Sequence, residues 1–325
     1  MKINLLSKIL FSAFLAFTLS TFLYFSFGNI YSSKILNYQE FTAQFSAGIY
    51  QYRILSSYLL FGVYDILSAV PIDYEIYRFK FFSSAAEPQM YLAFYILNTT
   101  FLVLCSSLMA FVLNGKQFIT TDAEQILLIS TAVFAMVFSQ FALVPYDISS
   151  YFFLLLFFLF FLKYLETRST LRLMIVALIM NISTLNRETS ALSISLAGTL
   201  LFSKYGFSKK SIQPLLVLAV TFVAVYVGMR LFQQSFSTND GNLLIKNFSD
   251  PKNLLGILCW LVFFVFTLLI AKDKKAVRHI LLFHILSVPY IVMCLYSGIL
   301  YEIRLYVPLF LTSLLLARLE LTKTQ

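Results

Sequence analysis

The chain has 325 residues, of which 60% are hydrophobic and only 12% are charged, and its mean hydropathy is +0.83. A soluble domain is about 45–50% apolar and about 25% charged, so this composition excludes a soluble globular protein and a disordered chain. The net charge of +9 is typical of basic cytoplasmic loops, and we expect no nucleic-acid partner. The sequence predicts one integral membrane domain that covers residues 1–325.

The first predicted element is the apolar run 9–27, which follows Lys2 and Lys8. It is longer than the apolar core of a typical signal peptide, and no A-x-A cleavage site follows it. We therefore expect a retained membrane helix.

A long outer loop, residues 28–88, is predicted after this helix. Its apolar run 54–70 carries Asp65, and the stretch 74–79 is rich in Tyr and Phe and carries Glu75 and Arg78. Segments of this kind are typical of amphipathic helices that lie in the membrane interface. We expect 54–70 to lie at the surface and not to cross.

The remaining apolar runs predict an all-α, polytopic bundle of about ten transmembrane crossings with both termini in the cytoplasm. Fifteen of the 24 basic residues but only five of the 15 acidic residues then lie on cytoplasmic connections. If 54–70 crossed, two basic clusters at 204–210 and 272–278 would face outward, against the positive-inside rule. The predicted crossings are 9–27, 89–114, 126–145, 150–165, 172–185, 190–203, 213–233, 254–271, 279–298 and 303–319.

Two neighbouring crossings, 172–185 and 190–203, have only 14 residues each. A helix needs about 20 residues to cross the hydrocarbon core. This pair is therefore predicted to be re-entrant, with the polar junction 186–189 at the outer surface or below it. Irregular backbone at that depth requires protein or a wet cavity around it.

Charged residues that flank the apolar runs gather on the predicted outer face. Intramembrane and interfacial charges usually mark functional sites because they are costly to place there. Arginine binds phosphate or carboxylate oxygens with two parallel hydrogen bonds, and a partly buried carboxylate can act as a base. The candidates are Glu40, Arg53, Asp65, Asp73, Glu75, Asp147, Arg187, Glu188, Arg230, Glu302 and Arg304.

The alternative interpretation of these charges is structural. Arg187 with Glu188, and Glu302 with Arg304, could form local ion pairs that stabilise helix ends. The sequence leaves both interpretations open.

The sequence does not indicate a metal site or a cofactor site. The three cysteines lie in apolar runs without metal-binding spacing, so we expect no metal site. No P-loop and no dinucleotide-binding motif occurs, and we expect no cofactor.

Three short segments carry a resemblance to a family. Gln51-Tyr52-Arg53-Ile54-Leu55, Asn186-Arg187-Glu188-Thr189 and Glu302-Ile303-Arg304-Leu305-Tyr306 resemble patterns in bacterial multi-pass proteins with a GT-C-like layout. The long first outer loop and the outward arginine and carboxylate turns are also similar to the GT-C class of membrane glycosyltransferases. The resemblance covers nearly the whole chain in layout.

The resemblance implies an enzyme of the bacterial inner membrane that takes a sugar from a polyprenyl-phosphate carrier for cell-surface glycan assembly. A carboxylate, Glu40 or Asp147, would accept the proton of the acceptor hydroxyl. The substrate-binding residues implied are Arg53, Arg187 and Arg304, which would stabilise the departing phosphate, and Glu188 and Glu302, which would orient them. Membrane lipid and a lipid-linked sugar phosphate are the expected partners.

Two other functions remain open at this stage. The same arginines could form the binding site of a transporter or flippase for an amphiphilic or anionic substrate. Alternatively, the chain could be a non-catalytic subunit of a polysaccharide-assembly machine. A transporter would move its substrate without breaking a bond, whereas a subunit would be inactive alone.

Overall fold

The computed structural model describes residues 3–71, 80–238 and 241–321. Within these ranges the regular structure is helical, apart from one isolated bridge between Phe118 and Leu319. The prediction of an all-α chain is confirmed. The predicted amphipathic stretch 74–79 lies outside the described residues.

The described helices follow the apolar runs of the sequence. The α-helices are α1 (Leu5–Ser26), α2 (Tyr38–Phe45), α3 (Ile54–Ala69), α4 (Pro88–Leu113), α5 (Asp122–Ser139), α6 (Asp147–Thr167), α7 (Thr170–Asn186), α8 (Ala191–Tyr205), α9 (Lys209–Phe232), α10 (Leu244–Ser249), α11 (Pro251–Leu269), α12 (Lys274–Leu286), α13 (Val288–Ser297) and α14 (Val307–Leu316). Short 3-10 turns are η1 (Ser33–Ile35), η2 (Tyr50–Tyr52), η4 (Glu188–Ser190) and η5 (Ile303–Leu305).

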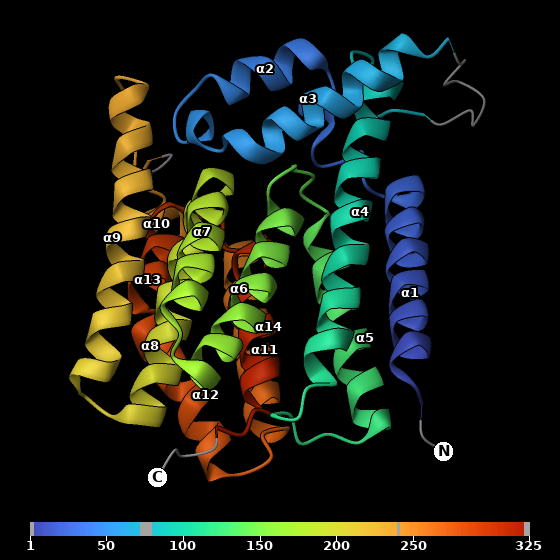
Figure 1. Ribbon diagram of the computed structural model, residues 1–325. Helices are drawn as coiled ribbons and strands as arrows, with labels where there is room; N and C mark the ends of the chain where they lie inside the picture. Colours follow the sequence, from blue (N-terminus) through green and yellow to red (C-terminus); the bar gives the residue numbers. More distant parts are fainter. Residues whose placement is uncertain (1–2, 72–79, 239–240, 322–325) are drawn as a thin grey trace.

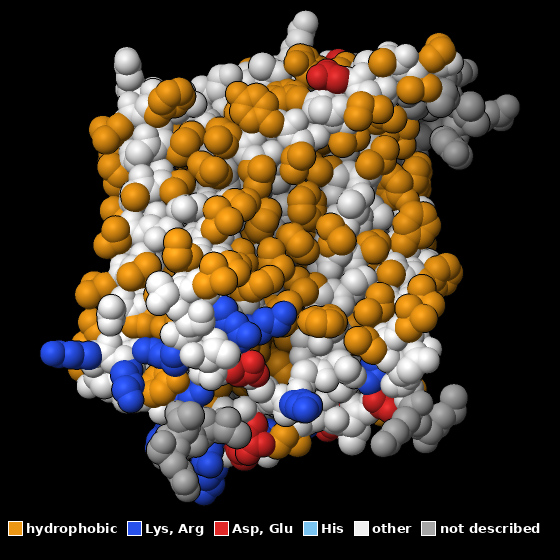
Figure 2. Space-filling model, in the orientation of Figure 1, with side chains coloured by type: hydrophobic (Ala, Val, Ile, Leu, Met, Phe, Trp, Pro, Cys, Tyr) orange, Lys and Arg blue, Asp and Glu red, His pale blue; other side chains and the backbone are white. Residues whose placement is uncertain are grey.

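Six of these helices, namely α1, α4, α5, α6, α9 and α11, are long and apolar enough to cross a membrane, and the bent pair α12–α13 makes a seventh candidate. Helices α3, α7 and α14 are apolar but shorter. Figure 2 shows hydrophobic side chains over most of the visible side of the bundle, with Lys and Arg side chains gathered toward one end. The chain is thus consistent with a multi-pass integral membrane protein.

Helices α2 and α3 lie across one end of the bundle (Figure 1). We call this end the capped end, and we call the opposite end, where α1 begins and α14 ends, the basal end. Helix α3 corresponds to the run 54–70, which was predicted to lie at a surface. Asn37 and Tyr64 both donate hydrogen bonds to Glu87, at 2.7 and 2.9 Å, and so attach this cap to the start of α4.

Helix α1 packs on α4 through a stripe of small residues. Ser12, Ala16 and Ser20 recur at every fourth position, which places them on one face of the helix, and all three are fully buried. Small side chains let two membrane helices approach closely. Ser20 and Thr99 share a hydrogen bond of 2.7 Å across this contact.

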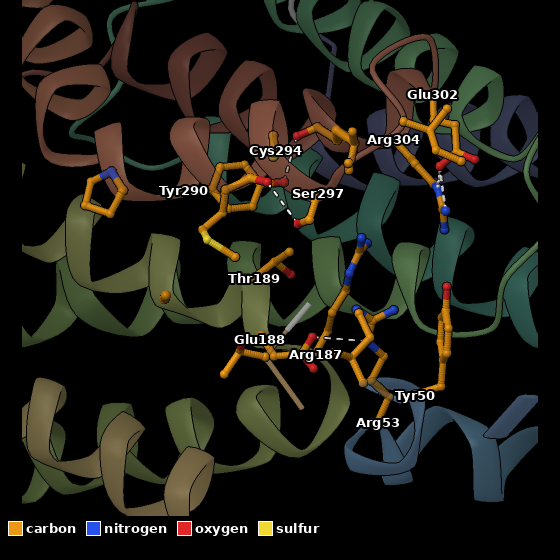
Figure 3. A pocket seen from close by; sticks show the side chains of 18 of the residues that line it. Tyr50, Arg53, Arg187, Glu188, Thr189, Tyr290, Cys294, Ser297, Glu302 and Arg304 are labelled. Atoms are coloured by element: carbon orange, nitrogen blue, oxygen red, sulfur yellow. Dashed lines mark hydrogen bonds and ion pairs between the residues drawn. The ribbon is translucent and has the colours of Figure 1, made fainter. Parts of the chain in front are cut away.

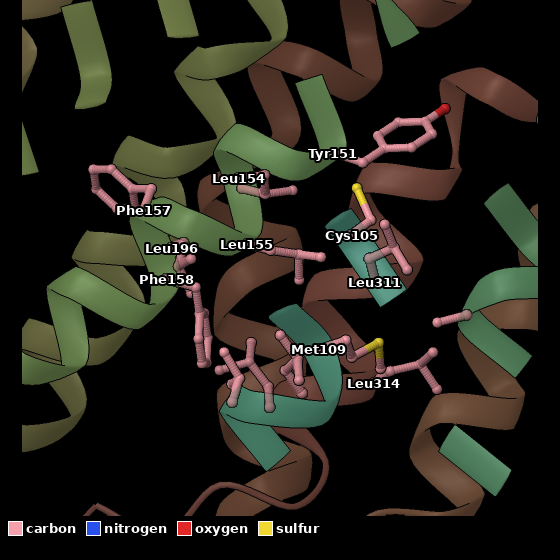
Figure 4. Close-up of a cluster of buried hydrophobic side chains, with 14 of the residues drawn as sticks. Cys105, Met109, Tyr151, Leu154, Leu155, Phe157, Phe158, Leu196, Leu311 and Leu314 are labelled. Atoms are coloured by element: carbon pink, nitrogen blue, oxygen red, sulfur yellow. The ribbon is translucent and has the colours of Figure 1, made fainter. Parts of the chain in front are cut away.

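Helices α6 and α14 form the centre of the bundle. All ten residues of α14 are buried. At about 1.5 Å per residue, this helix spans about half of a hydrocarbon core of about 30 Å. Figure 4 shows its Leu311 and Leu314 among side chains of α4 and α6, including Met109 and Leu155. Helix α14 is therefore surrounded by protein instead of lipid.

Several predicted crossings differ from the structure. The run 126–145 is helical only as far as Ser139, where α5 ends. The run 279–298 is broken at Ser287 into α12 and α13, which meet at an angle of 52°. Pro289 lies in the first turn of α13 and lacks a backbone N–H, which explains a break at this point. The run 303–319 begins with the turn η5, so α14 starts only at Val307.

Polar contacts close the basal end. The ammonium group of Lys8 is buried and donates hydrogen bonds to Asp122 at 2.5 Å and Gln125 at 2.7 Å. Arg318 forms an ion pair with Glu124 at 2.8 Å. The start of α1, the start of α5 and the segment after α14 are thereby held together.

We predict that replacing Lys8 with alanine lowers the free energy of unfolding by about 1–3 kcal/mol, because the oxygens of Asp122 and Gln125 lose a buried donor. Thermal unfolding of the purified protein in detergent measures this effect. Lys116→Ala is the matched control, since Lys116 is exposed at the same end. Equal stability of the two variants would contradict a structural role for the buried lysine.

Candidate functional site

A cavity of about 410 Å³ lies at the capped end of the bundle. Its wall is built from η2, the junction between α7 and α8, the C-terminal half of α9, helix α13 and the turn before α14. Five of the seven residues predicted as site residues line it, and Figure 3 shows them around the same space. These are Arg53, Arg187, Glu188, Glu302 and Arg304.

The sixth predicted residue, Asp147, lies behind two of these arginines. It begins α6, where the partial positive charge of a helix N-terminus favours a carboxylate. Its Oδ1 accepts a hydrogen bond from Arg187, and its Oδ2 lies 3.4 Å from Nη1 of Arg304. Only 3% of Asp147 is exposed. This one carboxylate therefore holds the α7–α8 junction and the turn before α14 together.

Arg304 also pairs with Glu302, two residues earlier. The guanidinium lies 2.6 Å from Oε2 of Glu302. The other oxygen, Oε1, accepts a hydrogen bond of 2.7 Å from the hydroxyl of Tyr31, which in turn accepts one from Tyr301. The loop after α1 thus fixes the position of Glu302.

Arg53 is held by one carboxylate and two aromatic rings. Its Nε donates to Oε2 of Glu188 at 3.1 Å. Its guanidinium carbon lies 5.0 Å from the ring centre of Tyr50 and 4.5 Å from that of Tyr146, which are cation–π distances. Arg187 contacts the ring of Tyr146 as well, at 5.6 Å. Tyr146 therefore fixes the spacing between the two arginines.

The arginines remain charged despite their burial. Burial alone would lower the pKa of Arg304, but the neighbouring carboxylates of Asp147 and Glu302 outweigh that effect and raise the pKa above its usual range. Burial also acts to lower the pKa of Arg53, and Glu188 reverses it in the same way. The wall of the cavity is consequently a set of permanent positive charges with negative partners behind or beside them.

A fourth arginine, Arg230 near the end of α9, is buried close to the same wall. Its guanidinium carbon lies 3.4 Å from the ring centre of Tyr226, which lines the cavity, and 4.2 Å from that of Tyr52. It donates hydrogen bonds to the backbone oxygens of Ser237 and Tyr226. Arg230 has no ion pair with a described carboxylate. The described residues at this site therefore carry four arginines and three carboxylates.

The opposite wall of the cavity is largely apolar. Phe222 and Tyr226 of α9 and Pro289 and Met293 of α13 contribute to it. Helix α9 is only 11% buried over its most apolar stretch, so most of its surface faces outward. The cavity therefore combines charged residues of loops and turns with apolar residues of two helices.

A close backbone contact positions the turn that carries Glu302 and Arg304. A Cβ atom on Gly256 of α11 would lie 1.7 Å from the backbone oxygen of Leu300, so only glycine fits there. The side-chain amide of Asn247 also donates to the backbone oxygens of Leu295 and Gly298. These contacts hold the turn against α10 and α11.

The seventh predicted residue, Glu40, is not brought to the cavity. It lies in the first turn of α2 and is exposed. Asp65 on α3 is also exposed and outside the cavity wall, whereas Asp73 and Glu75 lie outside the described residues. The charges of the first outer loop thus contribute only Arg53 to the described site.

The alternative interpretation, in which the charges form local ion pairs that stabilise helix ends, is supported for one of the two pairs that it names. Glu302 and Arg304 do pair with each other. Arg187 and Glu188, which are adjacent in sequence, instead pair with Asp147 and Arg53 respectively. These longer-range contacts join three separate segments of the chain into one network.

Sequence reasoning missed the tyrosines of the site. Tyr146 directly precedes Asp147, and Tyr50 and Tyr52 both shortly precede Arg53. A tyrosine next to a candidate charged residue was the pattern in the sequence that could have identified them. Within the described ranges, no group of three His, Cys, Asp or Glu side chains could hold a metal ion.

Comparisons with protein-family models, with curated proteins and with solved structures found no match for this chain. The geometry of the cavity is therefore the basis on which a function can be proposed for this chain.

We predict that Asp147→Asn lowers the free energy of unfolding by about 3–5 kcal/mol, because two buried arginines lose their shared partner. Chemical or thermal unfolding in detergent gives the measurement. The matched control is Glu166→Gln, since Glu166 and Arg172 form an ion pair of 3.9 Å in which both side chains are more than one third exposed. Its loss should cost about 1 kcal/mol or less. Similar losses in both variants would contradict the buried network.

Proposed function

We propose that this chain binds a lipid-linked sugar phosphate in the cavity at its capped end and acts as a GT-C-like glycosyltransferase in cell-surface glycan assembly. The observation that carries the proposal is the convergence of Arg53, Arg187 and Arg304 on one cavity whose other wall is apolar. A phosphate group fits the arginines, and a prenyl chain fits the apolar wall beside it.

The energetic cost of the arrangement supports a ligand over a purely structural role. Buried ion pairs are weak stabilisers, because removing two charges from water offsets most of their attraction. A protein that only needed to join these segments could use apolar side chains. Among the described residues of the site, four arginines face three carboxylates, which leaves one positive charge that a phosphate would offset.

The proposed membrane topology has ten crossings, with the capped end outside and both termini in the cytoplasm. In this arrangement α7, α8 and α14 complete the set of crossings as short helices, and the α7–α8 junction lies below the cap. The basic residues gathered toward the basal end support this orientation (Figure 2). The three segments that resemble the GT-C class, around Arg53, Arg187 and Arg304, all contribute to the cavity wall.

We predict that the purified protein in lipid nanodiscs binds tritiated polyprenyl phosphate more tightly than the uncharged polyprenol. Arg187→Lys keeps the positive charge beside Asp147 but loses the planar fork, and should weaken phosphate-lipid binding about 10- to 100-fold, as expected for a lost charge-assisted hydrogen bond. A filter-binding titration at fixed salt measures both affinities.

Arg318→Lys is the matched control for this experiment, because Arg318 pairs with Glu124 at the basal end. Its affinity for polyprenyl phosphate should equal that of the wild type. Equal binding of polyprenol and polyprenyl phosphate, or equal affinities of the Arg187 and Arg318 variants, would contradict a phosphate site at the capped end.

A further inference from the structure

The three carboxylates of the site differ in how many of their oxygens are occupied. Both oxygens of Asp147 are paired with arginines, and both oxygens of Glu302 accept hydrogen bonds, from Tyr31 and Arg304. Glu188 uses only Oε2, which accepts from Arg53. Within the part of the chain that the structure describes, its Oε1 has no hydrogen-bond partner and is shielded by the surrounding protein.

An unsatisfied carboxylate oxygen in a buried position is costly, at about 1–3 kcal/mol or more. Glu188 lines the cavity and extends from the α7–α8 junction toward Arg53 (Figure 3). The terminal torsion of a glutamate is broad and roughly two-fold, so this side chain can rotate at low cost to present an oxygen to a ligand. The cavity therefore provides one carboxylate with capacity for a hydrogen-bond donor of the ligand.

We propose that Glu188, and not Glu40 or Asp147, is the proton acceptor of the transfer reaction. This inference rests on the proposed function, since it assigns a catalytic residue to that activity. A hydroxyl of the acceptor donates its hydrogen bond to Oε1 of Glu188 beside the bound sugar phosphate. Asp147 is excluded from the role because it lies outside the cavity wall with both oxygens paired.

The chemical step balances with these groups alone. The acceptor oxygen forms a bond to the anomeric carbon of the sugar, and the bond between that carbon and the phosphate oxygen breaks. The hydroxyl proton passes to Glu188, and the electron pair of the broken bond stays on the departing polyprenyl phosphate. Neutral Glu188 then no longer offsets the charge of Arg53, so Arg53 becomes available to stabilise the additional phosphate charge.

The pairing of Arg53 with Glu188 gives this step a physical advantage. Before transfer, the carboxylate of Glu188 lies 3.1 Å from the buried guanidinium and offsets its charge. As Glu188 on one side of Arg53 receives the proton, negative charge develops on the departing phosphate on the other side of Arg53. The arginine therefore keeps a negative neighbour throughout, and the total charge in the cavity does not change.

The test compares Glu188→Gln and Glu40→Gln in nanodiscs. The probes are tritiated polyprenyl phosphate for binding, and polyprenyl phosphate that carries a labelled hexose for transfer to water or to a mixture of monosaccharides. We expect Glu188→Gln to bind polyprenyl phosphate at least as tightly as the wild type, because Arg53 loses its negative partner, and to lose about 100- to 10,000-fold in transfer rate. Glu40→Gln should retain the full rate.

A second variant separates proton transfer from a structural role. Glu188→Ala creates space beside Arg53, and added formate should restore part of its transfer rate, because formate supplies the missing carboxylate. A wild-type rate in Glu188→Gln, or a loss in Glu40→Gln alone, would overturn the assignment of Glu188 and leave the proposed function intact. Binding without any transfer by the wild type would overturn the transferase proposal and this inference with it.

Discussion

The buried contacts of Asp147 are the interaction on which the capped end depends. One carboxylate at the start of α6 holds Arg187 from the α7–α8 junction and Arg304 from the turn before α14. Charges in a membrane protein must be paired or reach water, so each arginine fixes the position of the segment that carries it. Arg53 joins this assembly through Glu188 and through the ring of Tyr146. The charged wall of the cavity is consequently held in place by contacts within the protein.

The two ends of the bundle use charge differently. At the basal end, Lys8 and Arg318 each pair with an acid of the α5 start and close the structure around a packed core. At the capped end, the pairs surround a cavity, and one side-chain atom each of Glu188 and Arg230 has no hydrogen-bond partner among the described residues. A binding site that is reached from one side of a membrane requires a bundle that is closed at one end and open at the other. The small residues of α1 and the fully buried α14 give the scaffold between them.

The sequence predicted the location of the candidate site better than its internal contacts. Arg53, Arg187 and Arg304 were grouped because each flanks an apolar run on the same predicted face, and the helix directions bring them together. Their partners depend on side-chain reach across the bundle, which sequence separation does not encode. Adjacent Arg187 and Glu188 therefore looked like a local pair, although they point to different partners.

Helix lengths were also only partly predictable. An apolar run of about 20 residues is the signal for a crossing in contact with lipid, but α14 is surrounded by protein and needs no such length. The break at Ser287 follows from Pro289, which a hydropathy count does not register. Glu40 was grouped with the site because it lies in the first outer loop, yet α2 places it on an exposed surface. Loop residues have no periodicity that would fix their direction.

In the proposed topology, the arginine-lined cavity opens at the outer face of the membrane. The direct test is to introduce single cysteines into a chain that lacks Cys105, Cys259 and Cys294. The positions are Thr189 in the cavity wall, Lys246 on α10 and Lys274 at the basal end. We expect an impermeant thiol reagent on intact cells to label positions 189 and 246 but not 274. Labelling of 274 without 189 and 246 would place the cavity in the cytoplasm and contradict its role in binding an outer-face lipid-linked sugar.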